Sequence, residues 1–404
     1  MLGFRNIALF QRAISFFVPN ALLEGSFSRV RGVPRKLLFL VSEDWYFCSH
    51  RLPLAVAAKK AGYEVVVVTR LSGMREMIEK AGLRVINLDM HRKSTNPFQA
   101  LLTLIQLWLI YWRERPDIVH HVALKPVLLG GMVARLTGIR AVVSAVAGMG
   151  FLFSDGGRMP IVQGIVKSLI SFAIGKGRAI VQNPEDAEIL RNLAVPGSRI
   201  SLIRGAGVNL EQFSFMEEKA GRPIVILPAR MLWDKGVLQF VKVARDLRRK
   251  GSKARFVLVG WTDDFNPASV LKSQLEHWQQ EGIVEWWGKR DDMANVFARS
   301  HVVCLPTFYG EGLPKALLEA AACGRPIITT DAPGCREIVH HGENGLLVPI
   351  KDAPALEASL LRVLSDPALR ARMGKKGREI AEQDFSVEKV VAETLMLYRE
   401  MAQA

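Results

Sequence analysis

Short apolar runs alternate with longer helix-like segments along the chain from residue 36 onward. Residues 36–41 (KLLFLV) form a short apolar run, and residues 63–69 (YEVVVVT) form a β-branched run, as is typical of strands covered on both faces of a parallel sheet. Helix-like segments that close at a glycine or proline separate these runs from further strands, expected at residues 84–88, 117–121 and 141–145. This repeated order predicts right-handed βαβ units in a doubly wound sheet.

The same order of elements begins again after residue 209. Strands are expected at residues 223–227, 255–260, 284–287, 301–306 and 326–330, and the chain closes with a helix at residues 386–401. We therefore expect an α/β fold of two Rossmann-like, doubly wound domains that face a central cleft. The division is an N-terminal extension at 1–35, domains at 36–207 and 208–385, and a C-terminal helix at 386–404. Because open α/β sheets bind ligands at the carboxyl ends of strands, the active site should follow strands of both domains.

The composition is that of a folded protein with an uneven charge. The chain has 404 residues, of which 49% are hydrophobic and 23% charged, which excludes wholesale disorder. Its net charge of +15 is compatible with nucleic acid, a membrane surface or an anionic small molecule. Residues 1–209 carry 27 basic and 13 acidic side chains, whereas residues 210–404 carry 27 and 26. A basic N-terminal half is therefore joined to a nearly neutral C-terminal half.

No segment is long enough to cross a bilayer as a helix. The longest apolar run, residues 100–112, is 13 residues long, whereas a spanning helix needs about 20. Residues 148–180 are apolar but interrupted by charged residues. Both segments could lie in a membrane interface or be ordinary buried helices. Trp108, Tyr111 and Trp112, together with the cations of this half, favour an anionic interface.

Processing and redox signals are weak. The apolar stretch 13–23 lacks a small-residue cleavage site, so we do not expect a cleaved signal peptide. The four cysteines form no Cys-x-x-Cys pair, and we expect free thiols in a reducing compartment.

The segment at residues 309–325 (YGEGLPKALLEAAACGR) contains the strongest candidate site. A glycine-bearing loop leads from a strand into a helix, with Pro314 expected at the first helical position and Gly324 at the C-terminal cap. The helix N-terminus offers backbone N–H groups of Gly312, Leu313 and Lys315, which suit a phosphate. Two carboxylates, Glu311 and Glu319, flank this position and could bind sugar hydroxyls. Alternatively, Glu319 pairs with Lys315 four residues earlier on the same helix face.

A second candidate follows the strand at residues 223–227. Arg230 and Lys235 stand five residues apart across the turn ARMLWDKG. They could converge on one anion, with the guanidinium supplying a fork and the ammonium a point charge. A solvated turn is the alternative interpretation.

Together these motifs resemble family 4 of the retaining glycosyltransferases, which have the GT-B fold. Glu311 and Glu319 have seven residues between them within EGLPKALLEA, and the resemblance also includes the segments RGAGVNLEQF (204–213), GKRDD (288–292) and DAPGCREIV (331–339). It covers nearly the whole chain after residue 36, and it implies that the C-terminal helix at 386–404 crosses back to the N-terminal domain. In the first half, SHRLPLA (49–55), HHVALKP (120–126) and AVAGMGFLFS (145–154) are similar to the subgroup that extends lipid-linked bacterial saccharides.

The resemblance implies a role for each matching residue on the donor side. Arg230 and Lys235 would neutralise the departing diphosphate, Glu319 would bind the ribose, and Glu311 would hold the donor sugar. Lys289 and Arg290 would contact the nucleotide base. The backbone N–H groups of Gly312, Leu313 and Lys315 would contact phosphate or sugar.

On two points the chain departs from the family pattern. Pro314 stands where the family commonly has another residue, and it removes one backbone N–H from the donor contact. The first strand loop, SEDWYFCSH (42–50), contains no glycine, so a phosphate contact there is not carried over.

The acceptor side is expected in the first domain. His120 and His121 close a strand at the cleft edge, and because successive strand residues point to opposite faces, one of them should face substrate. In the family a histidine here touches the donor sugar and the acceptor, and His120 is the favoured one. Lys125 could meet an acceptor phosphate, and the backbone at Gly148 and Gly150 could approach a ligand closely. His50 follows the first strand and could also line this site.

The resulting hypothesis is a retaining glycosyltransferase that needs no metal or other cofactor. Breaking a sugar–phosphate bond leaves a charged diphosphate, and the chain has no Asp-x-Asp motif to hold Mg²⁺ against it. The donor would be a UDP-sugar and the acceptor a polyprenyl-diphosphate-linked saccharide. The basic half would meet an anionic membrane, placing the protein at the cytoplasmic face of the cell membrane.

Two alternatives remain open from the sequence. One is a nucleotide-sugar 2-epimerase of the same fold, which would need no acceptor. The other is a nucleic-acid binder, suggested by the basic charge but lacking any recognisable binding module.

Overall fold

The computed structural model describes residues 35–90, 96–146, 148–149, 160–263, 266–308, 310 and 312–403. The chain divides into two compact units, Met1–Asn209 with Val387–Ala404, and Leu210–Ser386. The divisions expected from the sequence, at 207/208 and 385/386, lie one or two residues away. The arrangement of the two units about a cleft stays a prediction.

The first unit is built on a seven-stranded sheet with the order β3-β2-β1-β4-β5-β6-β7. Every paired strand is parallel. Starting from β1, the strands first extend to one edge through β2 and β3 and then to the other edge through β4 to β7, which confirms the doubly wound arrangement. The strands are β1 Lys36–Glu43, β2 Glu64–Arg70, β3 Arg84–Asn87, β4 Ile118–Val122, β5 Ala141–Ala145, β6 Arg178–Val181 and β7 Ile200–Leu202.

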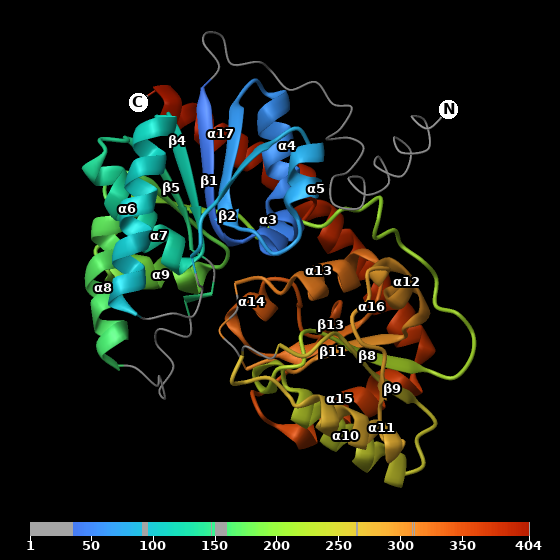
Figure 1. The fold of residues 1–404 in the computed structure, drawn as a ribbon. Coiled ribbons are helices and arrows are strands. Elements are labelled where there is room, and N and C mark those ends of the chain that lie inside the picture. The colour runs from blue at the N-terminus through green and yellow to red at the C-terminus, as the bar shows by residue number, and fades with distance from the viewer. Residues whose placement is uncertain are drawn as a thin grey trace, which may run out of the picture. The chain divides into compact units, whose positions relative to one another are not determined.

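Helices cover both faces of this sheet (Figure 1). One core joins α4 and α17 to the strand side chains that point toward them, and a second joins α6 and α7 to those on the opposite face. The C-terminal helix α17 thus belongs to the first unit, as expected. The helices are α3 Asp44–His50, α4 Leu52–Lys60, α5 Arg75–Lys80, α6 Pro97–Glu114, α7 Leu124–Leu136, α8 Pro160–Ile174, α9 Pro184–Asn192 and α17 Val387–Gln403.

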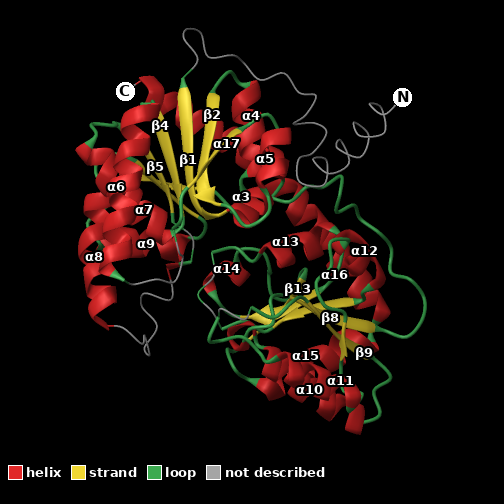
Figure 2. Cartoon of the chain, viewed as in Figure 1, coloured by secondary structure: helices red, strands yellow, loops and turns green. Residues whose placement is uncertain are grey.

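The second unit has a six-stranded parallel sheet with the order β10-β9-β8-β11-β12-β13. Helices α10, α11 and α15 lie on one side, and α12, α13, α14 and α16 on the other (Figure 2). The strands are β8 Ile224–Pro228, β9 Arg255–Val259, β10 Glu285–Trp286, β11 Val302–Leu305, β12 Ile327–Thr330 and β13 Gly345–Val348. The helices are α10 Val237–Arg249, α11 Lys272–Gln280, α12 Met293–Arg299, α13 Lys315–Ala322, α14 Pro333–Arg336, α15 Ala353–Ser365 and α16 Pro367–Asp384, with the 3₁₀ turn η3 at Trp233–Lys235.

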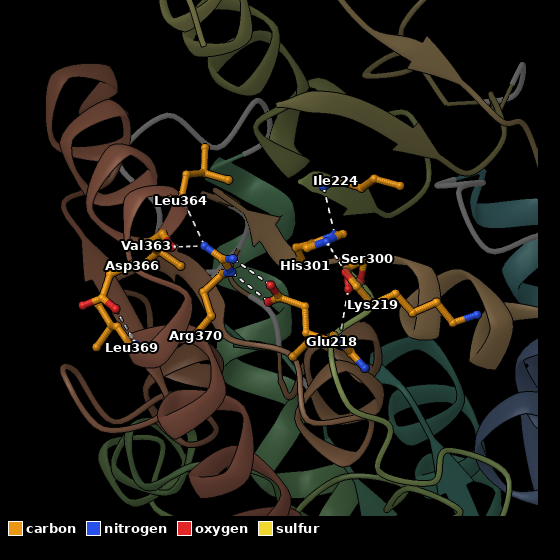
Figure 3. Close-up of polar contacts among 11 residues, drawn as sticks. Glu218, Lys219, Ile224, Ser300, His301, Val363, Leu364, Asp366, Leu369 and Arg370 are labelled. Atoms are coloured by element: carbon orange, nitrogen blue, oxygen red, sulfur yellow. Dashed lines mark hydrogen bonds and ion pairs between the residues drawn. The ribbon is translucent and has the colours of Figure 1, made fainter. Parts of the chain in front are cut away.

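Polar side chains fasten the segment that leads into β8 to the rest of the second unit (Figure 3). Arg370 donates two hydrogen bonds to Glu218, at 2.7 and 2.6 Å, and two more to the carbonyls of Val363 and Leu364. His301 accepts from the Ile224 backbone N–H at 3.1 Å, and its other ring nitrogen lies 3.0 Å from the Lys219 carbonyl oxygen. Nδ1 therefore carries no proton, and His301 is neutral in this arrangement.

Among the described helices, none is both long and apolar enough to span a bilayer. All four cysteines are buried free thiols.

Candidate active site

Three loops of the second unit meet at the carboxyl ends of β9, β8 and β11, which are neighbours in the sheet. The Asp234 carbonyl oxygen accepts from Phe308 N at 2.9 Å and from Thr307 Oγ1 at 3.1 Å. A Cβ on Gly236 would lie 2.1 Å from the Pro306 carbonyl oxygen, so only glycine permits this approach. The loop that carries Arg230 and Lys235 is therefore fixed directly against the loop that leads into α13.

Arg230 has a carboxylate partner in the structure. Its guanidinium lies 2.8 Å from the carboxylate of Asp263, and about a quarter of each side chain is exposed. Asp263 follows β9, and its backbone N–H donates to Ser269 Oγ at 2.9 Å, which fixes the loop. Convergence of Arg230 with Lys235 on one anion stays a prediction. Asp263 was missed at the sequence level because nothing local marks an acidic loop residue as the partner of an arginine 33 positions earlier.

Helix α13 begins one residue later than expected. Pro314 is its N-cap rather than its first residue, and the helix runs from Lys315 to Ala322. Pro314 has extended dihedrals, which suit the residue before a helix. Gly324 has φ of 69°, and Arg325 N donates to Ala320 O, so the predicted glycine cap is confirmed.

Glu319 is a nearly buried carboxylate on this helix. Its Oε1 lies 3.6 Å from Lys315 Nζ, so the alternative i, i+4 pair is present. Burial raises the pKa of Glu319, and the Lys315 charge partly offsets that increase. A desolvated carboxylate at the first turns of a helix can accept ligand hydroxyls without competition from bulk water. Its binding of a ribose stays a prediction.

The structure describes most of the other predicted donor-side residues, but not all of them. Glu311 lies outside the described residues, so the pair of carboxylates is not tested. Gly312 is buried and Leu313 half-buried immediately before α13. Lys289 lies on the loop after β10, with Nζ 5.7 Å from the Trp261 ring centroid. Arg290 forms an exposed ion pair with Asp292 at 2.7 Å.

The expectation for the histidine pair is wrong in one respect. His120 and His121 do point to opposite faces of β4, but both are fully buried, so neither ring is accessible at an edge. His121 Nε2 lies 2.8 Å from Tyr111 OH on α6, and His120 Nδ1 is hydrogen-bonded to Tyr398 OH on α17. Each ring is covered because a helix packs on each face of the sheet.

Both histidines are neutral in this environment. Burial lowers the pKa of His121 to about 3. Burial, followed by the nearby Arg51 charge, lowers the pKa of His120 well below its usual value. Arg51 is itself buried, and among the described residues its Nε has no hydrogen-bond partner.

Backbone N–H groups of the glycine segment in the first unit form hydrogen bonds within that unit. Gly148 N and Met149 N donate to the carboxylate of Asp186, at 3.2 and 3.1 Å. These two N–H groups are therefore hydrogen-bonded within the unit. A close approach of this backbone to a ligand stays a prediction, and Gly150 lies outside the described residues. Asp186 was missed, although Asn183 three residues before it marks a helix start, and Asn183 does accept from Asp186 N at 2.7 Å.

The remaining acceptor-side residues are near β-strand ends. Lys125 is the second residue of α7, directly after β4, and burial lowers its pKa. His50 closes α3, and its ring stacks on Tyr46 with centroids 4.1 Å apart. The structure does not test whether either residue meets an acceptor.

Two family models match the chain. The model of group 1 glycosyl transferases matches residues 209–380, and the glycosyl transferase 4-like model matches residues 36–183.

Two curated relatives are similar over most of their length. The N,N'-diacetylbacillosaminyl-diphospho-undecaprenol alpha-1,3-N-acetylgalactosaminyltransferase of Campylobacter jejuni is 31% identical over 349 residues, covering 82% of this chain and 90% of that protein. The UDP-Gal:alpha-D-GlcNAc-diphosphoundecaprenol alpha-1,3-galactosyltransferase of Escherichia coli is 29% identical over 314 residues, covering 74% of this chain and 79% of that protein.

Solved structures share the fold at low identity. Sucrose-phosphate synthase from Thermosynechococcus elongatus has a TM-score of 0.76 at 20% identity, covering 91% of this chain and 99% of that one. A glycosyltransferase from Rickettsia africae has a TM-score of 0.73 at 18% identity, covering 91% and 98%.

Proposed function

Because the chain belongs to the family-4-like glycosyltransferases and has their GT-B fold, we propose that it moves a sugar from a UDP-linked donor to a polyprenyl-diphosphate-linked saccharide. The reaction would extend a cell-surface polysaccharide or glycan at the cytoplasmic face of the membrane. The observation that carries the donor side is the joining of the Arg230–Lys235 loop to the α13 loop through Asp234.

The chemistry follows from the leaving group. The bond between the anomeric carbon and the donor phosphate oxygen breaks, and the acceptor oxygen bonds to the same carbon from the same face. The acceptor proton passes to the departing phosphate oxygen. Arg230, Lys235 and the N-terminus of α13 supply fixed positive potential for the developing diphosphate, which supports its departure without a metal or other cofactor.

The acceptor class is supported by the relatives and by the charge distribution. The names of both relatives specify a diphospho-undecaprenol-linked acceptor, and one of them specifies a UDP-linked donor. The excess of basic side chains in residues 1–209 suits an acceptor that carries a diphosphate and resides in an anionic membrane. Both relatives are transferases, and neither supports the 2-epimerase interpretation.

The donor is tested by a panel of nucleotide sugars read as thermal shifts. Binding to the folded state raises stability by RT ln(1 + [L]/Kd), so one UDP-sugar should raise the melting temperature more than the other members of the panel. Arg230→Ala should reduce the shift, and Arg245→Ala, on a surface ion pair with Glu281, is the matched control. Equal shifts with every nucleotide sugar, or none with any, would contradict the donor assignment.

Metal independence is tested by transfer to a lipid-diphosphate saccharide with and without EDTA. We expect an equal initial rate in both conditions and a product with the anomeric configuration of the donor. Abolition of transfer by EDTA, restored by Mg²⁺, would refute the metal-free mechanism. Inversion at the anomeric carbon would refute retention.

A further inference from the structure

Helix α6 presents an apolar face to solvent. Seven large side chains on it are between 36% and 77% exposed: Phe98, Leu101, Leu102, Ile105, Trp108, Leu109 and Trp112. Their spacing of three and four residues places them along one side of the helix. The opposite side buries Thr103, Leu107 and Tyr111 against the first unit.

Packing within the core of the first unit does not account for the apolar side chains on this face. α6 packs on α7 on the outside of the sheet (Figure 1). Its exposed apolar side chains run from Phe98 to Trp112. Contiguous exposed apolar surface of this kind on a folded protein marks an interaction site. The helix has 18 residues, fewer than the about 20 that would cross a bilayer.

The charge around the apolar face identifies the partner. Arg113 and Arg115 are exposed at its C-terminal end, and Glu114 is the only acidic residue in helices α6, α7 and α8. Glu114 is already engaged, since its carboxylate accepts hydrogen bonds from Arg84 and Lys36. An apolar stripe with tryptophans, cations at its border and no unpaired acid matches the headgroup boundary of an anionic bilayer.

We propose that α6 is the membrane-docking element of this protein and lies in the plane of an anionic bilayer. Its seven apolar side chains enter the boundary between headgroups and acyl chains, and Arg113 and Arg115 contact lipid phosphates. The purpose of this docking, delivery of a membrane-held acceptor, rests on the proposed function. The binding of α6 to lipid does not depend on the proposed function.

The test measures sedimentation of the full chain with vesicles of phosphatidylcholine alone and of phosphatidylcholine mixed equally with phosphatidylglycerol. Leu102→Glu/Trp108→Glu/Trp112→Glu should lower the partition coefficient on mixed vesicles by about tenfold or more, because acidic groups would enter the interface. The control Leu238→Glu/Leu361→Glu changes two exposed leucines of the second unit and should bind like wild type. Since all five positions are exposed, circular dichroism should show both variants folded.

The contribution of charge is tested separately. Arg113→Gln/Arg115→Asn should weaken binding to mixed vesicles but leave the weaker binding to phosphatidylcholine unchanged. Asparagine is chosen because residue 115 has φ of 46°, which asparagine tolerates.

Depth is read from tryptophan quenching by brominated lipids. We expect quenching in the wild type and its loss in Trp108→Phe/Trp112→Phe, which keeps the face apolar and should still bind. Quenching that persists in this variant would place other tryptophans in the lipid and overturn the proposal.

Three further outcomes would overturn the docking proposal. One is unchanged vesicle binding by the triple variant. Another is a shift of the triple variant from dimer to monomer in solution with no lipid binding by wild type, which would assign the face to a second copy. The third is binding that does not respond to phosphatidylglycerol.

A water-soluble, short-chain acceptor separates this proposal from the proposed function. The triple variant should transfer sugar to that acceptor at the wild-type rate and lose activity only on vesicle-embedded acceptor. Absence of transfer by both proteins, with vesicle binding intact in the wild type, would refute the proposed function and leave the docking proposal standing.

Discussion

Acidification should destabilise the first unit through His121. The ring is fully buried, and burial lowers its pKa from the usual 6.5 to about 3. Between pH 6.5 and 3 the unfolded chain binds a proton at this ring and the folded chain does not, so stability falls as the pH falls through this window. At pH 5 this one group costs about 2 kcal/mol of folding free energy relative to neutral pH.

The assay compares wild type with His121→Gln by urea unfolding at pH 7 and pH 5. Glutamine has nearly the volume of histidine, can hydrogen-bond to Tyr111 OH and does not titrate. The variant should lose about 2 kcal/mol less stability than wild type between the two pH values. The comparison between two proteins removes the contribution of other titrating groups, including Glu319, whose pKa is raised by burial and would act in the opposite direction. His277→Gln, on the exposed surface of α11, is the control.

Equal losses of stability in wild type and His121→Gln would refute the reasoning. They would mean that the His121 ring reaches solvent or an anion in the native protein at pH 5. A smaller loss in the wild type than in the variant would show a histidine that is protonated and paired when folded, which reverses the sign.

Three further variants test the second unit. Arg230→Ala should lower kcat by about a hundredfold through loss of charge stabilisation at the leaving diphosphate. Steady-state kinetics measures this decrease, and the melting temperature of the variant should be unchanged. Glu319→Gln should raise KM for the donor by about tenfold while the pH dependence of KM is lost, because the amide cannot ionise; an unchanged KM contradicts a contact with the donor. Arg370→Ala leaves Glu218 without its bidentate partner and should cost roughly 3 kcal/mol in urea unfolding, whereas the exposed Arg245→Ala should cost under about 1 kcal/mol.

The long strands and their connections could be predicted because their pattern is local. The central residues of β1, β2, β8 and β9 are buried on both faces and appear in the sequence as apolar runs. β6, β7 and β13 were missed, and length alone is not the reason, because β3, β11 and β12 are equally short and were predicted. β6 lies at the end of the apolar segment 148–180, which was treated as one stretch, β7 has only three residues, and β13 begins at a glycine.

The contacts that fix the site were harder to predict than the residue types at it. The motif residues Arg230 and Glu319 were identified, but their charged environment depends on Asp263 and on the burial of α13. His120 shows the same limit. Its hydrogen-bond partner Tyr398 is 278 positions away on the C-terminal helix, and no local spacing reveals that this helix covers the strand. Strand alternation gives the direction of a side chain, and only the packing of distant helices decides whether it is exposed.

The central claim is transfer of a sugar from a UDP-linked donor to a polyprenyl-diphosphate-linked saccharide at the Arg230–Lys235 and α13 loops. The direct measurement is the formation of an extended lipid-linked saccharide from a radiolabelled UDP-sugar by wild type, Arg230→Ala and the surface control Arg245→Ala. We expect extended product from wild type and the control, and about a hundredfold less from Arg230→Ala. Product formed equally by all three proteins, or no transfer from any UDP-sugar to any polyprenyl-diphosphate saccharide, would contradict the account.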